Sequence, residues 1–361
     1  MGKNKRAITL VIRLSSLGDV AILIPTLYSV ASKNPDDTFL LITKKPLQPL
    51  FFNKPDNLEI FPMQSKSRHS GFWGLVRAVR DINEIIKQIK NNSLGKDNSG
   101  ILLKVADLHA VIRSAIVDFF FMLEGAKIAV IDKSRLARQA LVRRENKRFV
   151  PLRTSLSRYQ EVFTKLGYDT TLSFNGFYPK ENPETETWIG IAPFAKHLGK
   201  IYPFEQMEEV IRILNDRPET RIFLFGGKEE SPLLEAWTKK YKQVESVAGL
   251  MPFPDELSLM NRLDLMLSMD SANMHLASLV NTPVVSVWGA THPYAGFYGY
   301  NQNPENAVQI DLSCRPCSIF GDKPCWRGDY ACLTRITPQM IVEKINSLLS
   351  RPQKASETLQ P

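Results

Sequence analysis

Short apolar runs alternate with longer segments of helical periodicity along the first half of the chain. The apolar runs that predict strands are 7–12, 38–42, 101–105 and 127–131. Apolar residues that recur every three to four positions predict helices near 19–32, 72–89 and 111–123. Strands that alternate with helices form βαβ units, so we expect a parallel sheet with helices packed on both faces.

This pattern breaks after Tyr168 and then starts again. Residues 169–187 are rich in Thr, Asn, Pro and Glu, which is typical of a linker between domains. Strands are then predicted at 188–192, 221–225, 244–247, 263–267 and 283–288, and helices near 203–215, 231–240, 255–261, 271–280 and 338–350. We therefore expect two doubly wound, Rossmann-like α/β domains, at 1–172 and 186–350, and a disordered tail at 351–361.

Two turns have the pattern of an anion-binding site at the start of a helix. In the segment Ser268–Pro293, Asp270 and Ser271 stand at the expected N-cap, so the backbone N–H groups of Ala272–Met274 would point at a ligand. A second turn, Arg13–Val20, follows the first strand and opens the first helix. Because open α/β sheets bind ligands at the carboxyl ends of their strands, a ligand is expected in a cleft between the domains. The alternative is two ordinary capped turns.

Charge along the chain is uneven. The sequence of 361 residues has a formal net charge of +9, and the segment 133–158 holds nine cations against the single acid Glu145. Such a segment favours an anionic membrane or lipid head group, with nucleic acid or a solvated helix face as alternatives. No run of 18 apolar residues occurs, and Arg13 interrupts the first short apolar stretch. We expect a cytoplasmic protein without a signal peptide or membrane span.

The four cysteines are clustered near the end of the chain, at Cys314, Cys317, Cys325 and Cys332. Four thiolates within nineteen residues suffice for a tetrahedral structural zinc ion, although the spacing matches no common zinc ribbon. The alternatives are reduced cysteines packed in a loop, or redox pairing.

Five motifs occur in one order along nearly the whole chain. They are R-x-S-S-L-G-D-V at 13–20, D-L-H-x-x-x-R-S at 107–114, a lysine followed by an aromatic residue and proline at 200–203, G-G-x-E at 226–229, and D-S-x-x-M-H-L-A at 270–277. With these motifs the chain resembles the ADP-heptose:lipopolysaccharide heptosyltransferases, glycosyltransferase family 9. The resemblance implies a GT-B fold of two Rossmann-like domains that face each other across a cleft. It also implies transfer of a heptose from an ADP-sugar to a lipid-linked acceptor, with inversion and without a catalytic metal ion.

The resemblance assigns the donor to the second half of the chain. Lys200 would neutralise the departing diphosphate, Glu229 would hold the ribose, and Asp270 would cap the helix and position its turn. The predicted donor-binding residues are Glu229, Asp270, Ser271, Ala272, Asn273 and Met274. His275 is expected to be buried, without a role in proton transfer.

The same resemblance assigns the acceptor to the first half. Asp19 would be the general base that takes the proton of the acceptor hydroxyl. Position alone favours a different role for Asp19, as a charge that complements the dipole of the first helix. The residues expected to face the acceptor or the transferred sugar are Ser16, Gly18, Asp107, His109 and Arg113.

Two other functions fit parts of this sequence. A nucleotide-sugar 2-epimerase of similar architecture would use the same phosphate-binding turn but need no acceptor. A non-catalytic module that binds anionic lipid or nucleic acid would account for the net charge. The motifs favour the transferase, whose partners would be the nucleotide sugar, a lipid-linked saccharide and the inner face of the cytoplasmic membrane.

Overall fold

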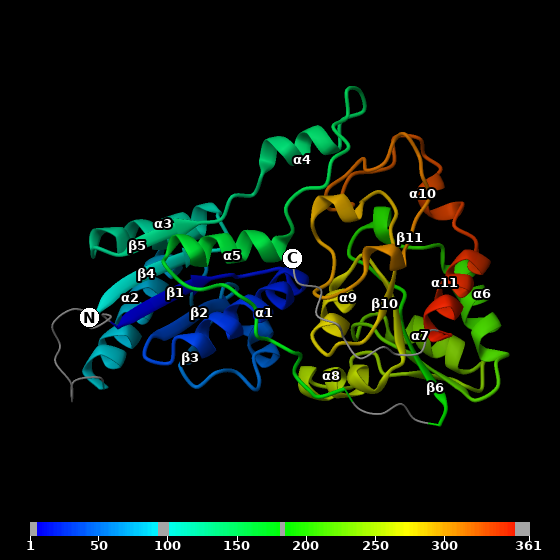
Figure 1. Ribbon diagram of the computed structural model, residues 1–361, viewed down its shortest axis with the longest axis horizontal. Helices are drawn as coiled ribbons and strands as arrows, with labels where there is room; N and C mark the ends of the chain where they lie inside the picture. Colours follow the sequence, from blue (N-terminus) through cyan, green and yellow to red (C-terminus); the bar gives the residue numbers. More distant parts are fainter. Residues whose placement is uncertain (1–5, 93–100, 181–184, 351–361) are drawn as a thin grey trace. The chain divides into compact units, whose positions relative to one another are not determined.

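The computed structural model describes residues 6–92, 101–180 and 185–350, which fall into two compact units (Figure 1). Unit 1 comprises Met1–Arg135 and Arg153–Phe177, and unit 2 comprises Leu136–Leu152 and Tyr178–Pro361. The expected domain bounds remain a prediction, and residues 136–152, which we expected with the first half, pack within unit 2. The predicted disordered tail, 351–361, lies outside the described residues.

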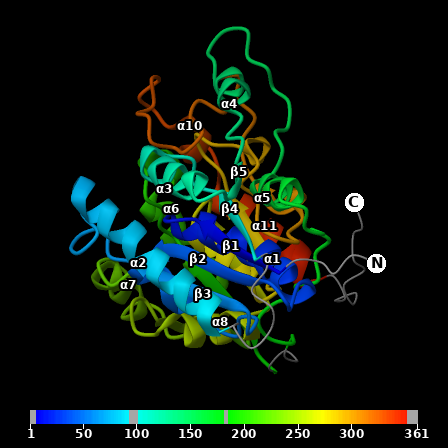
Figure 2. The same ribbon diagram turned by 90° about the vertical axis from the view of Figure 1, so that its left-hand side faces the viewer.

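Unit 1 is built on a parallel sheet with the strand order β3-β2-β1-β4-β5 within the described residues. Its strands are β1 (Ala7–Ile12), β2 (Thr38–Lys44), β3 (Leu58–Met63), β4 (Leu102–Asp107) and β5 (Lys127–Val130). Its helices are α1 (Leu17–Lys33), the 3-10 helix η1 (Lys45–Leu50), α2 (Gly71–Asn92), α3 (Ile112–Leu123) and α5 (Ser155–Lys165). Figure 2 shows α2 and α3 on one face of this sheet and α1 and α5 on the other.

The alternation of side chains along β1 explains these two layers. Ile8, Leu10 and Ile12 pack with α2 and α3 in one apolar core. In the register of the sheet, Ile12 lies opposite Ile42 of β2 and Asp107 of β4. The carboxyl ends of β1 and β4 therefore adjoin, and the loops that follow them are neighbours.

Unit 2 has a second parallel sheet, with the described order β11-β10-β9-β6-β7-β8. Its strands are β6 (Thr187–Ala192), β7 (Thr220–Leu224), β8 (Val244–Ser246), β9 (Leu265–Met269), β10 (Val284–Val287) and β11 (Ala307–Val308). The α-helices are α4 (Arg135–Leu141), α6 (Phe204–Asn215), α7 (Ser231–Thr238), α8 (Phe253–Arg262), α9 (Ala272–Ser278), α10 (Ala331–Thr334) and α11 (Pro338–Leu349). Three 3-10 turns complete it, η2 (Leu198–Lys200), η3 (Pro293–Ala295) and η4 (Pro304–Asn306).

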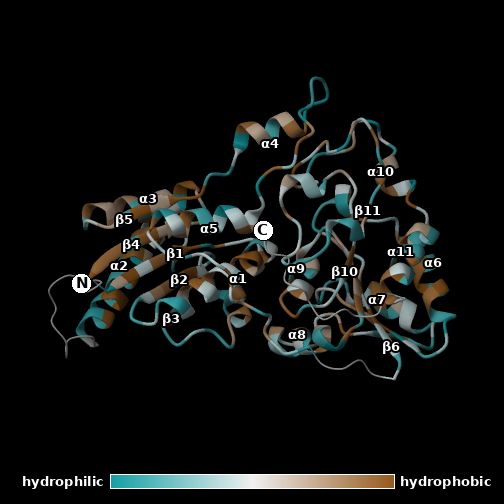
Figure 3. Cartoon of the chain, viewed as in Figure 1, coloured by the Kyte–Doolittle hydropathy of each residue, from teal (hydrophilic) through white to brown (hydrophobic). Residues whose placement is uncertain are grey.

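The central strands of the two sheets are largely apolar (Figure 3). In unit 2, the residues of β9 and β10 are fully buried, as expected for strands covered on both faces. Ser268 of β9 pairs with Ala192 of β6 and with Ser286 of β10, so the carboxyl ends of these three strands adjoin. No helix in the described part of the chain is long and apolar enough to cross a membrane.

Several elements were not predicted from the sequence. Strand β3 contains Pro62, which cannot donate a backbone hydrogen bond and is tolerated because β3 is an edge strand. Helices α4 and α5 lie in the segment 133–158 or begin there, where the dense positive charge obscures the helical period. Strand β11 and helix α10 are two and four residues long, which is too short to leave a periodic signal.

Candidate functional site

In unit 1, the turn between β1 and α1 holds Asp19 in an ion pair. Oδ2 of Asp19 lies 2.6 Å from a guanidinium nitrogen of Arg13. The same oxygen accepts hydrogen bonds from the backbone N–H of Ser16 at 3.1 Å and from its hydroxyl at 2.8 Å. Ser16 is the N-cap of α1, so Asp19 also closes a capping box at the start of that helix.

These contacts keep Asp19 ionised. Burial acts to raise the pKa of Asp19, but the charge of Arg13 and the hydrogen bonds from Ser16 outweigh it, and the pKa is lowered. All three contacts use Oδ2, and within the described residues Oδ1 accepts no hydrogen bond. A carboxylate with one oxygen fixed and the other open has the geometry of a base that approaches a hydroxyl group.

The loop after β4 adjoins this turn and contains the next motif. Oδ1 of Asp107 accepts the backbone N–H groups of His109 and Ala110, each at 2.8 Å. Its Oδ2 accepts the hydroxyl of Ser114 at 2.7 Å. The backbone of Ala110 has a positive φ of 47°, a conformation that the buried Asp107 carboxylate stabilises by holding both N–H groups.

His109 belongs to the same electrostatic environment as Asp19. Burial, followed by the positive charges of Arg13 and Lys133, lowers the pKa of His109 to about 4. The imidazole is therefore neutral at pH 7 and is suited to hydrogen bonding rather than to ion pairing. Arg113, the last predicted residue of this group, is exposed at the start of α3.

In unit 2, the predicted Lys200 forms the second ion pair. Its Nζ lies 2.8 Å from Oδ2 of Asp270, and the same oxygen accepts the hydroxyl of Thr291 at 2.8 Å. Lys200 ends η2 after β6, Asp270 follows β9, and Thr291 follows β10. The three adjoining strands thus bring one cation, one carboxylate and one hydroxyl group to the same edge of the sheet.

Close backbone packing holds the lysine in place. Gly321 has a φ of 74°, and a Cβ atom there would lie 2.7 Å from Cγ of Lys200. The backbone N–H of Ala290 donates to the carbonyl of Gly199 at 2.8 Å. Lys200 is therefore fixed by the segment after β10 and by the loop that contains the cysteines.

The turn before α9 differs in one respect from our expectation. Ser271, and not Asp270, is the N-cap residue, because the carboxylate of Asp270 is used to hold Lys200. Ala272 and Asn273 are partly exposed in the first turn, whereas Met274 is buried. His275 is buried inside α9, as the sequence predicted.

The turn that follows β7 contains two adjacent acidic residues. Glu229, the predicted ribose ligand, is exposed in the turn. The neighbouring Glu230 folds back, and its Oε2 accepts the backbone N–H of Gly227 at 2.7 Å. A Cβ atom on Gly226 would lie 2.8 Å from that oxygen, so a larger residue there would displace the Glu230 carboxylate. Glu230 is thus the carboxylate that the structure orders at this turn.

The cysteines do not form the expected metal site. Within the described residues, no group of three or more His, Cys, Asp or Glu side chains is arranged to hold a metal ion. All four cysteines are free and line one small cavity. Burial raises the pKa of Cys317, and that of Cys332 to about 11. The zinc prediction is therefore not supported, and the alternative of reduced cysteines in a loop fits better.

The basic segment is not one continuous solvated patch. Lys147 donates to the carbonyl groups of Ser313, Arg315 and Pro316, at 2.7–3.1 Å, and so stabilises the cysteine loop. Arg144 lies over the ring of Trp326, and Arg153 pairs with Asp132 and Glu161. Many cations of this segment thus have contacts within the protein.

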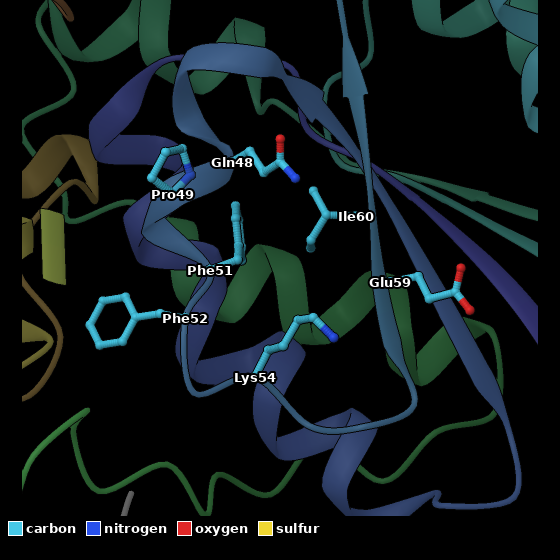
Figure 4. A pocket seen from close by; sticks show the side chains of 7 residues that line it. All are labelled: Gln48, Pro49, Phe51, Phe52, Lys54, Glu59 and Ile60. Atoms are coloured by element: carbon cyan, nitrogen blue, oxygen red, sulfur yellow. The ribbon is translucent and has the colours of Figure 1, made fainter. Parts of the chain in front are cut away.

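A separate pocket of about 600 Å³ in unit 1 contains none of the predicted site residues. Figure 4 shows its lining, which comes from η1, the loop after it and β3: Gln48, Pro49, Phe51, Phe52, Lys54, Glu59 and Ile60. Its position at the sheet edge separates it from the loops that follow β1 and β4.

Sequence reasoning missed the residues that hold the predicted ones. Arg13 stands within the first motif and Thr291 follows the last, but neither was assigned a partner. Arg315 was also missed, and its buried guanidinium donates to the carbonyls of Gly289, Trp288 and Thr291. Arg13 left a signal, because it is a charged residue at the end of the apolar run 7–12, whereas Thr291 and Arg315 left none.

Comparison with known proteins gives a consistent result. A sequence model of glycosyltransferase family 9 (heptosyltransferase) matches residues 104–323. Lipopolysaccharide heptosyltransferase 3 of Escherichia coli is 21% identical over 294 residues, covering 76% of this chain and 81% of that protein.

Solved structures agree on the fold. The family 9 glycosyltransferase of Veillonella parvula has a TM-score of 0.71 at 19% identity and covers 96% of this chain and 97% of that one. E. coli heptosyltransferase WaaC with ADP has a TM-score of 0.61 at 18% identity, covering 94% and 99%. The GT-B fold is thus confirmed. Because the family match spans more than half of the residues, the chain belongs to glycosyltransferase family 9, the family of the heptosyltransferases.

Proposed function

We propose that this enzyme transfers a heptose, or a related sugar, from an ADP-sugar to an inner-core lipopolysaccharide acceptor, with inversion at the anomeric carbon. The observation that carries this proposal is the triad of Lys200, Asp270 and Thr291 at the carboxyl edge of the unit 2 sheet. It presents a fixed cation where open α/β sheets bind phosphate groups.

We propose that the donor diphosphate is stabilised by electrostatic interactions. When the bond between the anomeric carbon and the diphosphate oxygen breaks, ADP leaves with the electron pair and additional negative charge. Lys200 neutralises this charge, and the N–H groups at the start of α9 donate to the same phosphates. Glu229, exposed in the turn that follows β7, with Glu230 beside it, is the candidate for the ribose hydroxyls. This arrangement needs no divalent metal, and we propose that the transfer proceeds without one.

At the acceptor, the proposed reaction requires transfer of a proton from the acceptor hydroxyl group. As the acceptor oxygen bonds to the anomeric carbon, its proton passes to the open Oδ1 of Asp19. Arg13 fixes the other oxygen, so the carboxylate is oriented before the acceptor binds. We propose that neutral His109 and exposed Arg113, with Ser16 and Gly18 in the turn, contact the acceptor or the transferred sugar.

The donor is tested by calorimetry with ADP-heptose, ADP, UDP-N-acetylglucosamine and UDP. We expect selective binding of ADP-heptose and ADP; preference for the uridine compounds would overturn the donor assignment. The reaction is tested by incubating ADP-heptose with a heptose-deficient inner-core lipid, with and without a chelator. We expect a new glycosidic bond of inverted configuration in both samples. Loss of activity on chelation, restored by a metal ion, would overturn the metal-independent mechanism.

A control separates this activity from the epimerase alternative. ADP-heptose is incubated with the enzyme in the absence of acceptor, and the sugar configuration is followed by NMR. A transferase leaves the donor unchanged or hydrolyses it slowly, whereas an epimerase converts the sugar without a second substrate.

We also propose that the enzyme works in the cytoplasm against the anionic inner face of the membrane, and that helix α3 makes the contact. Large apolar side chains are exposed on this helix, with Ile112 82% and Leu123 68% exposed. The apolar face of α3 is formed by Ile112, Phe119, Phe120, Met122 and Leu123. Arg113 beside it, and Arg77 and Arg80 on the adjacent α2, provide the cations that anionic lipid favours.

This contact is tested by sedimentation with phosphatidylglycerol vesicles. We expect the double variant Phe119→Ser/Phe120→Ser to bind less, while Leu233→Ser, which removes an exposed leucine of unit 2, binds like wild type. Equal binding of both variants would exclude α3 as the lipid contact. A changed oligomeric state of the double variant would instead identify the face as an interface between copies of the chain.

A further inference from the structure

Helix α3 carries a buried acid that the proposed reaction does not use. Asp118 lies on the inner side of α3, next to Val117 and Phe121 of the apolar core. It lies one helical turn after Ser114, whose hydroxyl is 2.7 Å from Oδ2 of Asp107, and the two carboxyl groups interact through charge and a hydrogen bond. Oδ1 of Asp118 is buried and accepts no hydrogen bond from the described residues. An isolated acid in such a place is costly unless it is neutral.

Two carboxyl groups in hydrogen-bond contact must share a proton, because two carboxylates offer only acceptors. The surroundings decide which group holds it. Both oxygens of Asp107 already act as acceptors, Oδ1 from two backbone N–H groups and Oδ2 from the hydroxyl of Ser114. Asp118 has no comparable donors among the described residues, so the proton belongs to Asp118.

The electrostatics agree with this assignment. Burial, and then the charge and hydrogen bond of Asp107, raise the pKa of Asp118 to about 8. Arg13 and His109 are the charged and titratable groups that face Asp107. Lys127 of β5 and Asp81 of α2, on the other elements packed against α3, are not among the causes of the shift.

The loop that this pair supports leads to the proposed base. Asp107 orders the N–H groups of His109 and Ala110, and the carbonyl of Leu108, the residue after Asp107, accepts a hydrogen bond from Arg13. Arg13 in turn fixes Oδ2 of Asp19. A continuous set of contacts therefore runs from Asp118 through the loop 107–110 to Asp19, all within unit 1.

We propose that Asp118 is a positioning residue for the transfer reaction: it stays protonated in the folded enzyme, donates its hydrogen to Asp107, and thereby fixes the loop that holds Arg13 and Asp19. The inference rests on the proposed function only in its effect on transfer. The shared proton and the ordered loop are properties of the free protein.

The first test needs no substrate. Infrared spectra of wild type and Asp118→Asn at pH 6.5 are subtracted to reveal the C=O stretch of a protonated carboxyl group. Subtraction also removes the signal of Glu256, whose pKa burial raises to about 7. We expect a band that belongs to Asp118 and disappears as the pH rises through about 8. Absence of this band overturns the proposal, whatever the donor and acceptor prove to be.

The second test separates positioning from general stability. Asp118→Asn keeps a donor to Asp107, whereas Asp118→Val keeps the shape but removes the donor. We expect Asp118→Val to exchange the amide hydrogens of His109 and Ala110 faster and to lose at least tenfold in kcat, with donor affinity unchanged. We expect wild-type turnover to decline above pH 8, and Asp118→Asn to retain slow exchange and kcat without that decline. Wild-type exchange and kcat in Asp118→Val would refute the positioning role. Should the valine variant not fold, the infrared band and the pH profile of Asp118→Asn still decide.

Discussion

Each of the two sheets has an ion pair near the carboxyl ends of its strands, and the acid and the cation have opposite roles in the two pairs. In unit 1 an acid, Asp19, is held by a cation, Arg13, and in unit 2 a cation, Lys200, is held by an acid, Asp270. The side chains of Asp19 and Lys200 are 25% and 15% exposed, whereas those of their partners Arg13 and Asp270 are 10% and 4% exposed. In each pair the buried member is the holder, and the exposed member is the one that solvent or substrate reaches.

Because of this difference in burial, we expect the exposed member of each pair to act in the reaction and the buried member to position it. Removal of an exposed member should affect chemistry and leave the fold intact, because its buried partner keeps its other hydrogen bonds. Removal of a buried member should leave the exposed group present but wrongly charged or misplaced. Both pairs can be tested on this basis.

The largest expected effect follows from Asp19→Asn. The amide oxygen still accepts from Ser16, so the start of α1 is preserved, but the base is lost. We expect kcat to fall by about 10²- to 10⁴-fold, while the calorimetric affinity for donor stays within about twofold. Asp216→Asn, an exposed acid of unit 2, is the control and should behave like wild type. Weakened donor binding in Asp19→Asn would contradict its assignment to the acceptor.

Lys200→Ala comes second. Loss of the cation should weaken binding of ADP and reduce kcat by roughly 10²- to 10³-fold, since the leaving diphosphate gains charge in the transition state. Lys196→Ala, an exposed lysine of the same loop, is the matched control. If both variants bind ADP and turn over like wild type, Lys200 does not contact the donor.

The fold could be predicted where local patterns and burial agree. Strand β1 has the predicted bounds, Ala7–Ile12, because its six residues are all buried and apolar apart from one threonine. Helix α5 was missed although Tyr159, Val162 and Phe163 repeat at helical spacing, because the neighbouring arginines suggested a surface patch. Strand β3 was missed because Pro62 argues against a strand unless the position at a sheet edge is known.

The candidate site shows the same limit. Asp19 and Lys200 were found because they stand in local motifs. The residues that hold Lys200 come from tertiary contacts: Asp270 and Thr291 follow different strands, and they meet only because of the strand order in the sheet. Asp118 did leave a local signal, since it is the one acid within the apolar stretch of α3. The cysteines show a further limit: the zinc prediction is not supported, because spacing alone cannot distinguish buried thiols from metal-binding thiolates.

Substitution of Arg13, the buried member of the ion pair in unit 1, should have a smaller effect on activity, and this effect should depend on pH. In wild type, Arg13 and Ser16 outweigh burial and lower the pKa of Asp19, so the base stays ionised below the usual range for an aspartate. In Arg13→Gln, burial remains and the opposing charge is lost, so the pKa of Asp19 should rise. We expect the acidic limb of the profile of kcat/KM against pH to move to higher pH. An unchanged limb would show that Asp19 is not the group that titrates in it.

The smallest effect is expected from Thr291→Val, which acts on the residue that supports Asp270 in unit 2. The substitution preserves volume and removes the hydroxyl that donates to Asp270, but Lys200 still pairs with the carboxylate. We expect a loss of about 1 kcal/mol, or roughly fivefold, in donor affinity by calorimetry, because Asp270 can then rotate away from Lys200. Thr282→Val removes a buried hydroxyl that donates to the carbonyl of Met260 in the same unit. This control should lower thermal stability without changing donor affinity. If both variants weaken donor binding equally, the effect of Thr291 arises from general packing and not from its hold on Asp270.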